Sequence, residues 1–137
     1  TGSYVLMALQ QRNPDCPTRV IPGITAISAA AAAAAWPLAL QQDQLLVMPC
    51  PETPDALTGL LETAAQHSRV LALMKLGHRW SWVRPLLECQ NLLSGALFAE
   101  RVGWPDQIVR SAGELQASER PYFSLLLVRQ GWPDVLP

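Results

Sequence analysis

The sequence predicts an α/β domain in which helices flank a mixed β-sheet. Three apolar runs have the length of buried strands, at residues 44–50 (QLLVMPC), 69–75 (RVLALMK) and 122–130 (YFSLLLVRQ). Segments with apolar residues at helical spacing precede and separate the first two of these runs. Strands that alternate with helices favour a sheet covered by helices, and 137 residues fit one domain, or one domain and part of another.

The elements of the first third follow from local signals. A helix is predicted at residues 3–11, where apolar side chains recur at helical spacing. Residues 18–22 (TRVIP) are predicted to form a short strand that enters a tight turn at Pro22-Gly23. The alanine-rich segment after Thr25 is predicted to be a helix because alanine is the best helix former, and Trp36-Pro37 ends it.

The remaining elements are predicted in the same way. A helix is predicted in residues 53–66, with Thr53 as N-cap and Pro54 at the first helical position. Residues 79–89 form an amphipathic pattern that Pro85 would kink unless the helix starts near it. Further strands are expected at 95–102 and 106–110, and the very apolar run at 122–130 is expected to be the central strand.

Composition excludes several classes of function. The net charge of −1 argues against a protein that binds nucleic acid by neutralising phosphates. Cys16, Cys50 and Cys89 are far apart and belong to no Cys/His cluster, so neither a metal site nor a disulfide framework is predicted. A reducing, cytoplasmic location is the simplest expectation.

The uncharged segment 20–40 (VIPGITAISAAAAAAAWPLAL) is long enough to cross a bilayer. Pro22, Gly23 and Pro37 interrupt it, and alanine contributes little transfer free energy. It also lies too far from the start of the chain to be a signal peptide. We therefore expect no association with a membrane.

From the residues alone, candidate sites lie at the ends of strands, where open α/β sheets bind ligands. Thr25 follows the predicted turn and could cap a helix or contact a ligand. Met74 could be a core residue, while Lys75 and Arg101 could be ordinary solvated charges. His78 follows a strand in a loop and could equally be a plain surface residue. No phosphate-binding loop or nucleophile elbow is present in the sequence.

Four segments, VIPGITAISAAAAAAAWPLAL, VLALMKLG, ALFAERVGWPDQIV and PYFSLLLVRQG, resemble the tetrapyrrole methylase family in order and spacing. These S-adenosylmethionine-dependent enzymes of corrin and sirohaem synthesis have two α/β domains, with the cofactor in the cleft between them. The LMK, ER and PYFSLLLVR residues are most similar to the branch that methylates precorrin-2 or cobalt-precorrin-2 at carbon 20, in cobalamin biosynthesis.

The resemblance covers the later part of the family pattern and lacks its glycine-rich loop and Gly-Asp-Pro stretch. It implies a carboxyl-terminal fragment, with residues 1–26 a remnant of the first domain and 27–137 the second α/β domain. By itself such a fragment is expected to be inactive, and the full-length protein is expected to be a homodimer. Two alternatives stay open: another tetrapyrrole methylase of the same fold, or a non-catalytic binding or dimerisation module.

The resemblance also implies roles for individual residues. The reaction would be direct displacement at the methyl group of S-adenosylmethionine, leaving S-adenosylhomocysteine, which needs alignment and exclusion of water more than an acid or base. No catalytic residue is therefore assigned, and the partner is a small tetrapyrrole carrying many carboxylates. The implied cofactor contacts are Thr25, Ala26, Met74, Ala99 and Ser124, and the cations that would hold the substrate carboxylates are Lys75, His78, Arg79 and Arg101.

Overall fold

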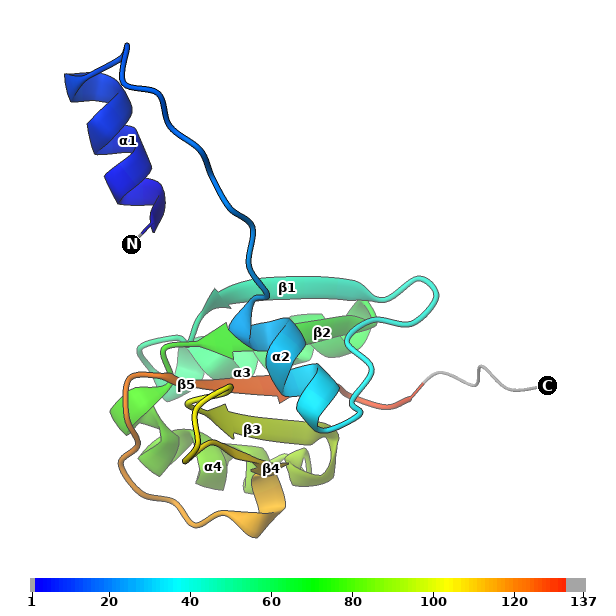
Figure 1. Cartoon of the computed structure of the whole chain (residues 1–137). Coiled ribbons are helices and arrows are strands. Elements are labelled where there is room, and N and C mark those ends of the chain that lie inside the picture. Colours follow the sequence, from blue (N-terminus) through cyan, green and yellow to red (C-terminus); the bar gives the residue numbers. More distant parts are fainter. Residues whose placement is uncertain (1, 133–137) are drawn as a thin grey trace.

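A five-stranded mixed sheet lies at the centre of the chain in the computed structural model, which describes residues 2–132 (Figure 1). The sheet order is β1-β2-β5-β3-β4. β1 and β2 are parallel, and the other neighbouring pairs are antiparallel. The predicted mixed sheet is confirmed, and the apolar run at 122–130 supplies its middle strand. The strands are β1 (Gln44–Pro49), β2 (Arg69–Met74), β3 (Ala96–Glu100), β4 (Ile108–Ser111) and β5 (Ser124–Val128).

The strand directions bring several chain ends to one edge of the sheet. Because β5 runs antiparallel to both β2 and β3, the strands β1, β2 and β3 all point the same way. Their carboxyl ends therefore share one edge with the first residue of β5, Ser124. This is the edge at which the sequence predicts a ligand site.

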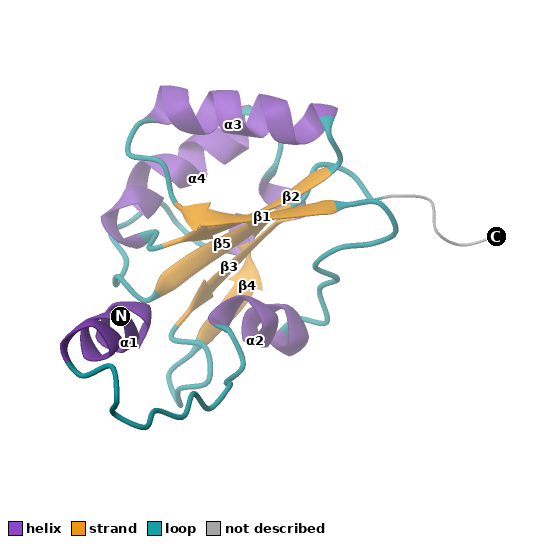
Figure 2. Cartoon of the chain, turned by 90° about the horizontal axis from the view of Figure 1, so that it is seen from above, coloured by secondary structure: helices purple, strands orange, loops and turns teal. Residues whose placement is uncertain are grey.

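Helices cover both faces of the sheet, as Figure 2 shows. α3 (Pro54–Gln66) and α4 (Trp80–Cys89) lie on one face, and α2 (Ala26–Ala33) lies on the other. The face under α3 and α4 carries large buried side chains such as Leu73, Phe98 and Leu126. The face under α2 includes the small residues Ala72 and Ala99, which pack with Ala30 and Ala31 of that helix. The absence of side-chain bulk allows α2 to approach the sheet closely.

The ends of two helices match their sequence signals. Thr53 caps α3 by accepting a hydrogen bond from Ala56 N–H at 3.3 Å, and Pro54 occupies the first turn. His67 is the C-cap residue of the same helix. α4 begins directly after a single 3₁₀ turn (Gly77–Arg79) and includes Pro85 within its length. Both helix predictions are confirmed.

The prediction of a strand at residues 18–22 and a tight turn at Pro22-Gly23 is wrong. Residues 17–25 have no regular secondary structure, and Val20 and Ile21 are 70% and 78% exposed. A strand needs a neighbour to pair with its backbone groups, and none of the described strands lies beside this segment (Figure 1).

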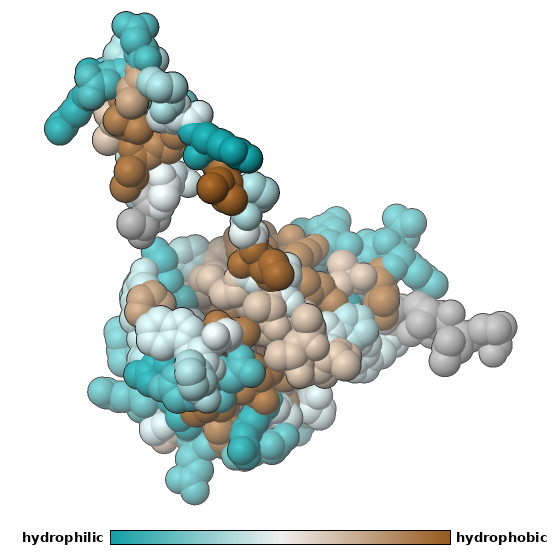
Figure 3. Space-filling model, viewed as in Figure 1, coloured by the Kyte–Doolittle hydropathy of each residue, from teal (hydrophilic) through white to brown (hydrophobic). Residues whose placement is uncertain are grey.

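α1 (Gly2–Arg12) forms as predicted but has no buried residue. It stands apart from the sheet at the end of the extended segment, and Figure 3 shows apolar surface on both. The body of the structure begins with α2 at Ala26. The predicted domain boundary at residue 26 stays a prediction. Residues 1 and 133–137 of the two predicted domains lie outside the described residues.

A buried ion pair closes the edge of the sheet opposite the ligand edge. The Arg129 guanidinium donates to Asp43 Oδ2 at 2.6 Å, and the two side chains are 3% and 7% exposed. Trp36 and Trp132 flank that guanidinium, with ring centroids 5.7 and 4.6 Å away. Burial acts to raise the pKa of Asp43, but hydrogen bonds from Leu40 N–H and Arg129 outweigh it and hold the pKa below its usual value. The pair ties the loop after α2 to the end of β5.

Candidate functional site

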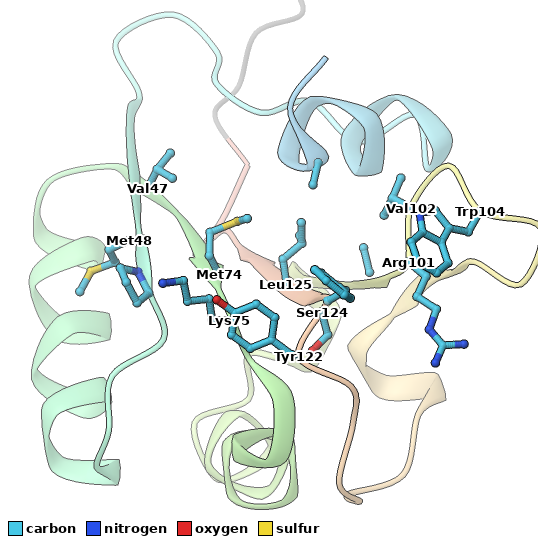
Figure 4. A pocket seen from close by; sticks show the side chains of 14 residues that line it. Val47, Met48, Met74, Lys75, Arg101, Val102, Trp104, Tyr122, Ser124 and Leu125 are labelled. Atoms are coloured by element: carbon cyan, nitrogen blue, oxygen red, sulfur yellow. The ribbon is translucent and has the colours of Figure 1, made fainter. Parts of the chain in front are cut away.

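A pocket of about 570 Å³ opens where β1, β2 and β3 end, between the sheet and the start of α2 (Figure 4). This volume lies within the range of small-molecule sites in proteins. The residues that line it are Ala26, Val47, Met48, Pro49, Met74, Lys75, Ala99, Arg101, Val102, Trp104, Tyr122, Phe123, Ser124 and Leu125.

The floor of the pocket is a row of apolar residues on three adjacent strands. Met74 of β2 is paired in register with Leu125 of β5, which is paired on its other side with Ala99 of β3. Residues paired in this way project their side chains from the same face of the sheet, here the face under α2. Ala26, the first residue of α2, lines the pocket from the opposite side. The small Ala99 side chain leaves depth between them.

Three aromatic side chains, Trp104, Tyr122 and Phe123, form the mouth of the pocket, and we refer to them as the aromatic rim. They are 56%, 59% and 64% exposed. The ring centroids of Trp104 and Phe123 are 6.2 Å apart, and those of Tyr122 and Phe123 are 5.5 Å apart. A large apolar area thus remains accessible at the entrance.

The charged side chains that line the pocket are both basic. Lys75 follows β2 in a left-handed backbone conformation (φ 57°) and forms no ion pair within residues 2–132. Arg101 follows β3, also in a left-handed conformation (φ 49°), and its guanidinium pairs with Asp106. None of the described lining residues is acidic. The entrance therefore favours an anionic ligand.

Ser124 lines the pocket, but its hydroxyl group is engaged in the fold. Ser124 Oγ accepts a hydrogen bond from Gly77 N–H at 2.9 Å and donates one to the Pro121 carbonyl at 2.7 Å. The Ser124 carbonyl also accepts from Leu76 N–H at 3.1 Å. These bonds hold the turn after β2 against the start of β5 and so fix the shape of the pocket edge.

The structure keeps three predicted site residues out of the pocket lining. Thr25 caps α2 by accepting from Ser28 N–H at 3.2 Å, one position before the lining residue Ala26. Arg79 pairs with Glu52, and this hydrogen bond is the main cause of the lowered pKa of the Glu52 carboxyl. His78 is exposed on the 3₁₀ turn that follows Lys75.

The described chain offers little for nucleophilic or metal chemistry. Cys50 is buried at the end of β1, and burial is the main cause that raises its thiol pKa to about 11, so it stays protonated near neutral pH. Within residues 2–132, no three His, Cys, Asp or Glu side chains come together in a group that could hold a metal ion. No helix among the described residues is long and apolar enough to span a membrane.

Comparison with known proteins gives the family. Residues 1–117 match the family of Tetrapyrrole (Corrin/Porphyrin) Methylases. The chain belongs to this family. It is 34% identical over 134 residues to the precorrin-2 C(20)-methyltransferase of Sinorhizobium sp, covering 97% of this chain and 52% of that protein. It is also 34% identical over 121 residues to the cobalt-precorrin-2 C(20)-methyltransferase of Salmonella typhimurium, covering 85% and 49%.

Other relatives extend the same picture. The cobalamin biosynthesis protein CobIJ of Mycobacterium tuberculosis is 34% identical over 112 residues, which are 82% of this chain and 21% of that protein. The crystal structure of the methyltransferase CobJ matches with a TM-score of 0.58 and 25% identity, over 93% of this chain and 58% of CobJ. Cobalt precorrin-4 methyltransferase CbiF matches in fold, with a TM-score of 0.61 and 18% identity. The chain thus spans a fifth to about half of its curated relatives.

The pocket brings together six of the nine predicted site residues, although their roles stay predictions. Trp104 lies in a GWPD sequence (103–106) that is typical of a turn, and the sequence pattern puts Tyr122 and Phe123 at the start of a buried strand. Tyr122 and Phe123 are exposed at the pocket mouth because β5 begins only at Ser124, a boundary that the sequence pattern does not define. The predicted residues in the pocket lining are Ala26, Met74, Lys75, Ala99, Arg101 and Ser124.

Proposed function

We propose that the protein takes part in cobalamin biosynthesis as an S-adenosylmethionine-dependent methyltransferase that methylates a carbon of a tetrapyrrole. The observation that carries this proposal is that one pocket, at the edge where β1, β2 and β3 end, gathers Ala26, Met74, Ala99 and Ser124. Family membership supports the same reaction class. Because the chain spans about half of its C(20)-methyltransferase relatives, the activity is proposed for the complete natural protein.

The residues of the pocket fit an adenosylated cofactor. When bound, S-adenosylmethionine supplies an activated methyl group on its sulfonium. Met74, Leu125 and Ala99 would pack against the adenosine and exclude water from it. Ala26 N–H belongs to the first turn of α2, where backbone donors have no partner within the helix, and it could bind a polar edge of the cofactor. The uroporphyrin-III C-methyltransferase of Thermus thermophilus, a fold neighbour, was solved with S-adenosylhomocysteine.

Positioning is the chemical task that this pocket is suited to perform. Its described lining residues include no carboxylate and no imidazole that could move a proton. Transfer of a methyl group to a nucleophilic carbon depends on alignment of the two reacting centres. The chain would therefore accelerate the reaction by holding the methyl donor and the macrocycle in line. Lys75 lines the pocket and would pair with a carboxylate of the macrocycle.

We further propose precorrin-2 or cobalt-precorrin-2 as the substrate and carbon 20 as the methylated position, supported by the names of two relatives. The test incubates the complete protein with S-adenosylmethionine carrying a ¹³C-labelled methyl group and with either compound. The expected result is one labelled methyl at carbon 20, located by NMR. A label on another ring carbon would leave methyl transfer intact and refute the position, while no transfer to either compound would refute this substrate.

A further inference from the structure

The aromatic rim is held in place by backbone contacts between two loops. Arg101 N–H donates to the Phe123 carbonyl at 2.9 Å, which joins the loop after β3 to the segment before β5. Within the first loop, Trp104 N–H donates to the Arg101 carbonyl at 3.0 Å. The turn needs a left-handed residue at Gly103 (φ 88°), whose N–H donates to Gln107 Oε1 at 2.9 Å. Trp104 and Phe123 are thus preorganised although they are exposed.

The rim differs from the floor of the pocket in chemistry and in depth. The floor is aliphatic and buried at Ala99 and Leu125, whereas the rim is aromatic and more than half exposed. The planes of Trp104 and Phe123 are tilted by 38° to each other, while Tyr122 meets Phe123 edge-on at 80°, and all three side chains line the pocket. Such a surface suits a flat ligand wider than one heterocycle.

We propose that the aromatic rim binds the face of the tetrapyrrole macrocycle, and that Trp104 and Phe123 are positioning residues for the methylated carbon. This inference rests on the proposed function. The cofactor would occupy the aliphatic floor, so a macrocycle on the rim would lie above it at the pocket mouth. Lys75 and Arg101 border the same opening, and their charges complement the carboxylates around the macrocycle.

The experiment measures two affinities in the complete protein, for uroporphyrin III and for S-adenosylhomocysteine, by fluorescence and calorimetry. The variants are Trp104→Leu and Phe123→Leu, which keep an apolar side chain but remove the ring. Trp104→Phe and Phe123→Tyr keep a ring, and Leu45→Ala is the control, an exposed aliphatic residue of β1 outside the pocket lining. Circular dichroism and thermal melting establish that each variant is folded.

We expect each leucine variant to weaken uroporphyrin III binding roughly 5- to 10-fold, with S-adenosylhomocysteine affinity changed less than about twofold. The ring-retaining variants and Leu45→Ala should bind uroporphyrin III like the wild type. Unchanged uroporphyrin III binding in both leucine variants would overturn the inference and leave the proposed function standing. The inference is also overturned if the leucine variants lose affinity for S-adenosylhomocysteine and not for uroporphyrin III, or if self-association is the only property that they lose. A wild type that binds S-adenosylhomocysteine but not uroporphyrin III would overturn the inference and count against a tetrapyrrole as the substrate class.

Discussion

The hydroxyl of Ser124 accepts a hydrogen bond from the backbone N–H of Gly77 at 2.9 Å, which joins the start of β5 to the turn after β2. Gly77 is buried, so its N–H depends on this bond. The turn contains Lys75 and the strand contains Leu125, and both line the pocket. One side chain therefore sets the distance between two walls of the candidate site.

Ser124→Ala should reduce the free energy of unfolding by about 1–3 kcal/mol, because it leaves a buried N–H without an acceptor. Urea denaturation measures the change. Ser94→Ala is the matched control, since Ser94 is exposed in a short 3₁₀ turn, and it should alter stability by less than about 0.5 kcal/mol. Equal changes in the free energy of unfolding for the two substitutions would show that the Ser124 hydroxyl does not stabilise the fold.

Asp43→Asn should be strongly destabilising, by about 3–5 kcal/mol, because it leaves the buried Arg129 guanidinium without a countercharge. Asp106→Asn breaks an ion pair whose side chains are far more exposed and should cost no more than about 1 kcal/mol. Thermal and urea unfolding compare the two variants with the wild type. Similar losses in both would contradict the assignment of the Asp43–Arg129 pair as a structural clamp.

The same pair makes stability depend on pH. Because folding lowers the pKa of Asp43, its carboxylate contributes stability above its unfolded-state pKa of about 4. That contribution is lost as the pH falls through the lower pKa of the folded state. The difference between the unfolding free energies of the wild type and Asp43→Asn should therefore begin to shrink as the pH falls below about 4, and should continue to shrink down to the folded-state pKa. A difference that stays constant from neutral pH into this acid range would mean that Asp43 does not titrate as described.

Gly95→Ala tests the packing at the start of β3. A Cβ atom at Gly95 would lie 2.2 Å from the Arg129 carbonyl oxygen, so the two backbones would have to separate, at a cost of about 1–3 kcal/mol. Gly59→Ala meets no atom within 4 Å and lies inside α3, where it should stabilise by about 0.5–1 kcal/mol. Urea denaturation should therefore show a lower free energy of unfolding for Gly95→Ala and a higher one for Gly59→Ala. A change of the same sign in both variants would count against the close approach of Gly95 to Arg129.

Lys75→Gln should weaken uroporphyrin III binding by the complete protein about two- to fivefold, because an exposed ion pair contributes less than about 1 kcal/mol. The loss should shrink as salt is raised from low to physiological concentration. Lys75→Arg keeps the charge and should bind nearly normally, and Arg110→Gln, an exposed charge on β4 outside the pocket, is the control. A loss independent of salt would argue for a packing role of Lys75.

Elements with strong local signals could be predicted from the sequence. α3 has its capping residue at Thr53 and a first-turn proline at Pro54, and the buried strands are predicted by their apolar composition. The segment 18–22 has strand-like residues too, yet it lacks a neighbouring strand. Pairing is a tertiary property, and no local pattern reports it.

The candidate site was predictable only in part, for the same reason. Met74 and Ala99 could be identified from the sequence as residues near strand ends. Only the strand order brings them together, because each is paired with Leu125 of β5. Trp104 and Phe123 come together through the hydrogen bond between Arg101 N–H and the Phe123 carbonyl, a contact between loops 22 residues apart in the sequence. Arg79 is basic and follows a strand, but its pairing with Glu52 occupies it elsewhere.

The central claim is that the floor of the pocket binds the methyl donor, and ¹³C-methyl NMR of methionine tests it most directly. The chain has three methionines, of which Met48 and Met74 line the pocket and Met7 lies on α1 outside it. On titration of the complete protein with S-adenosylhomocysteine, the Met74 resonance, assigned through Met74→Leu, should shift and saturate with the affinity found by calorimetry, while Met7 stays in place. An unshifted Met74 signal at calorimetric saturation would contradict the claim.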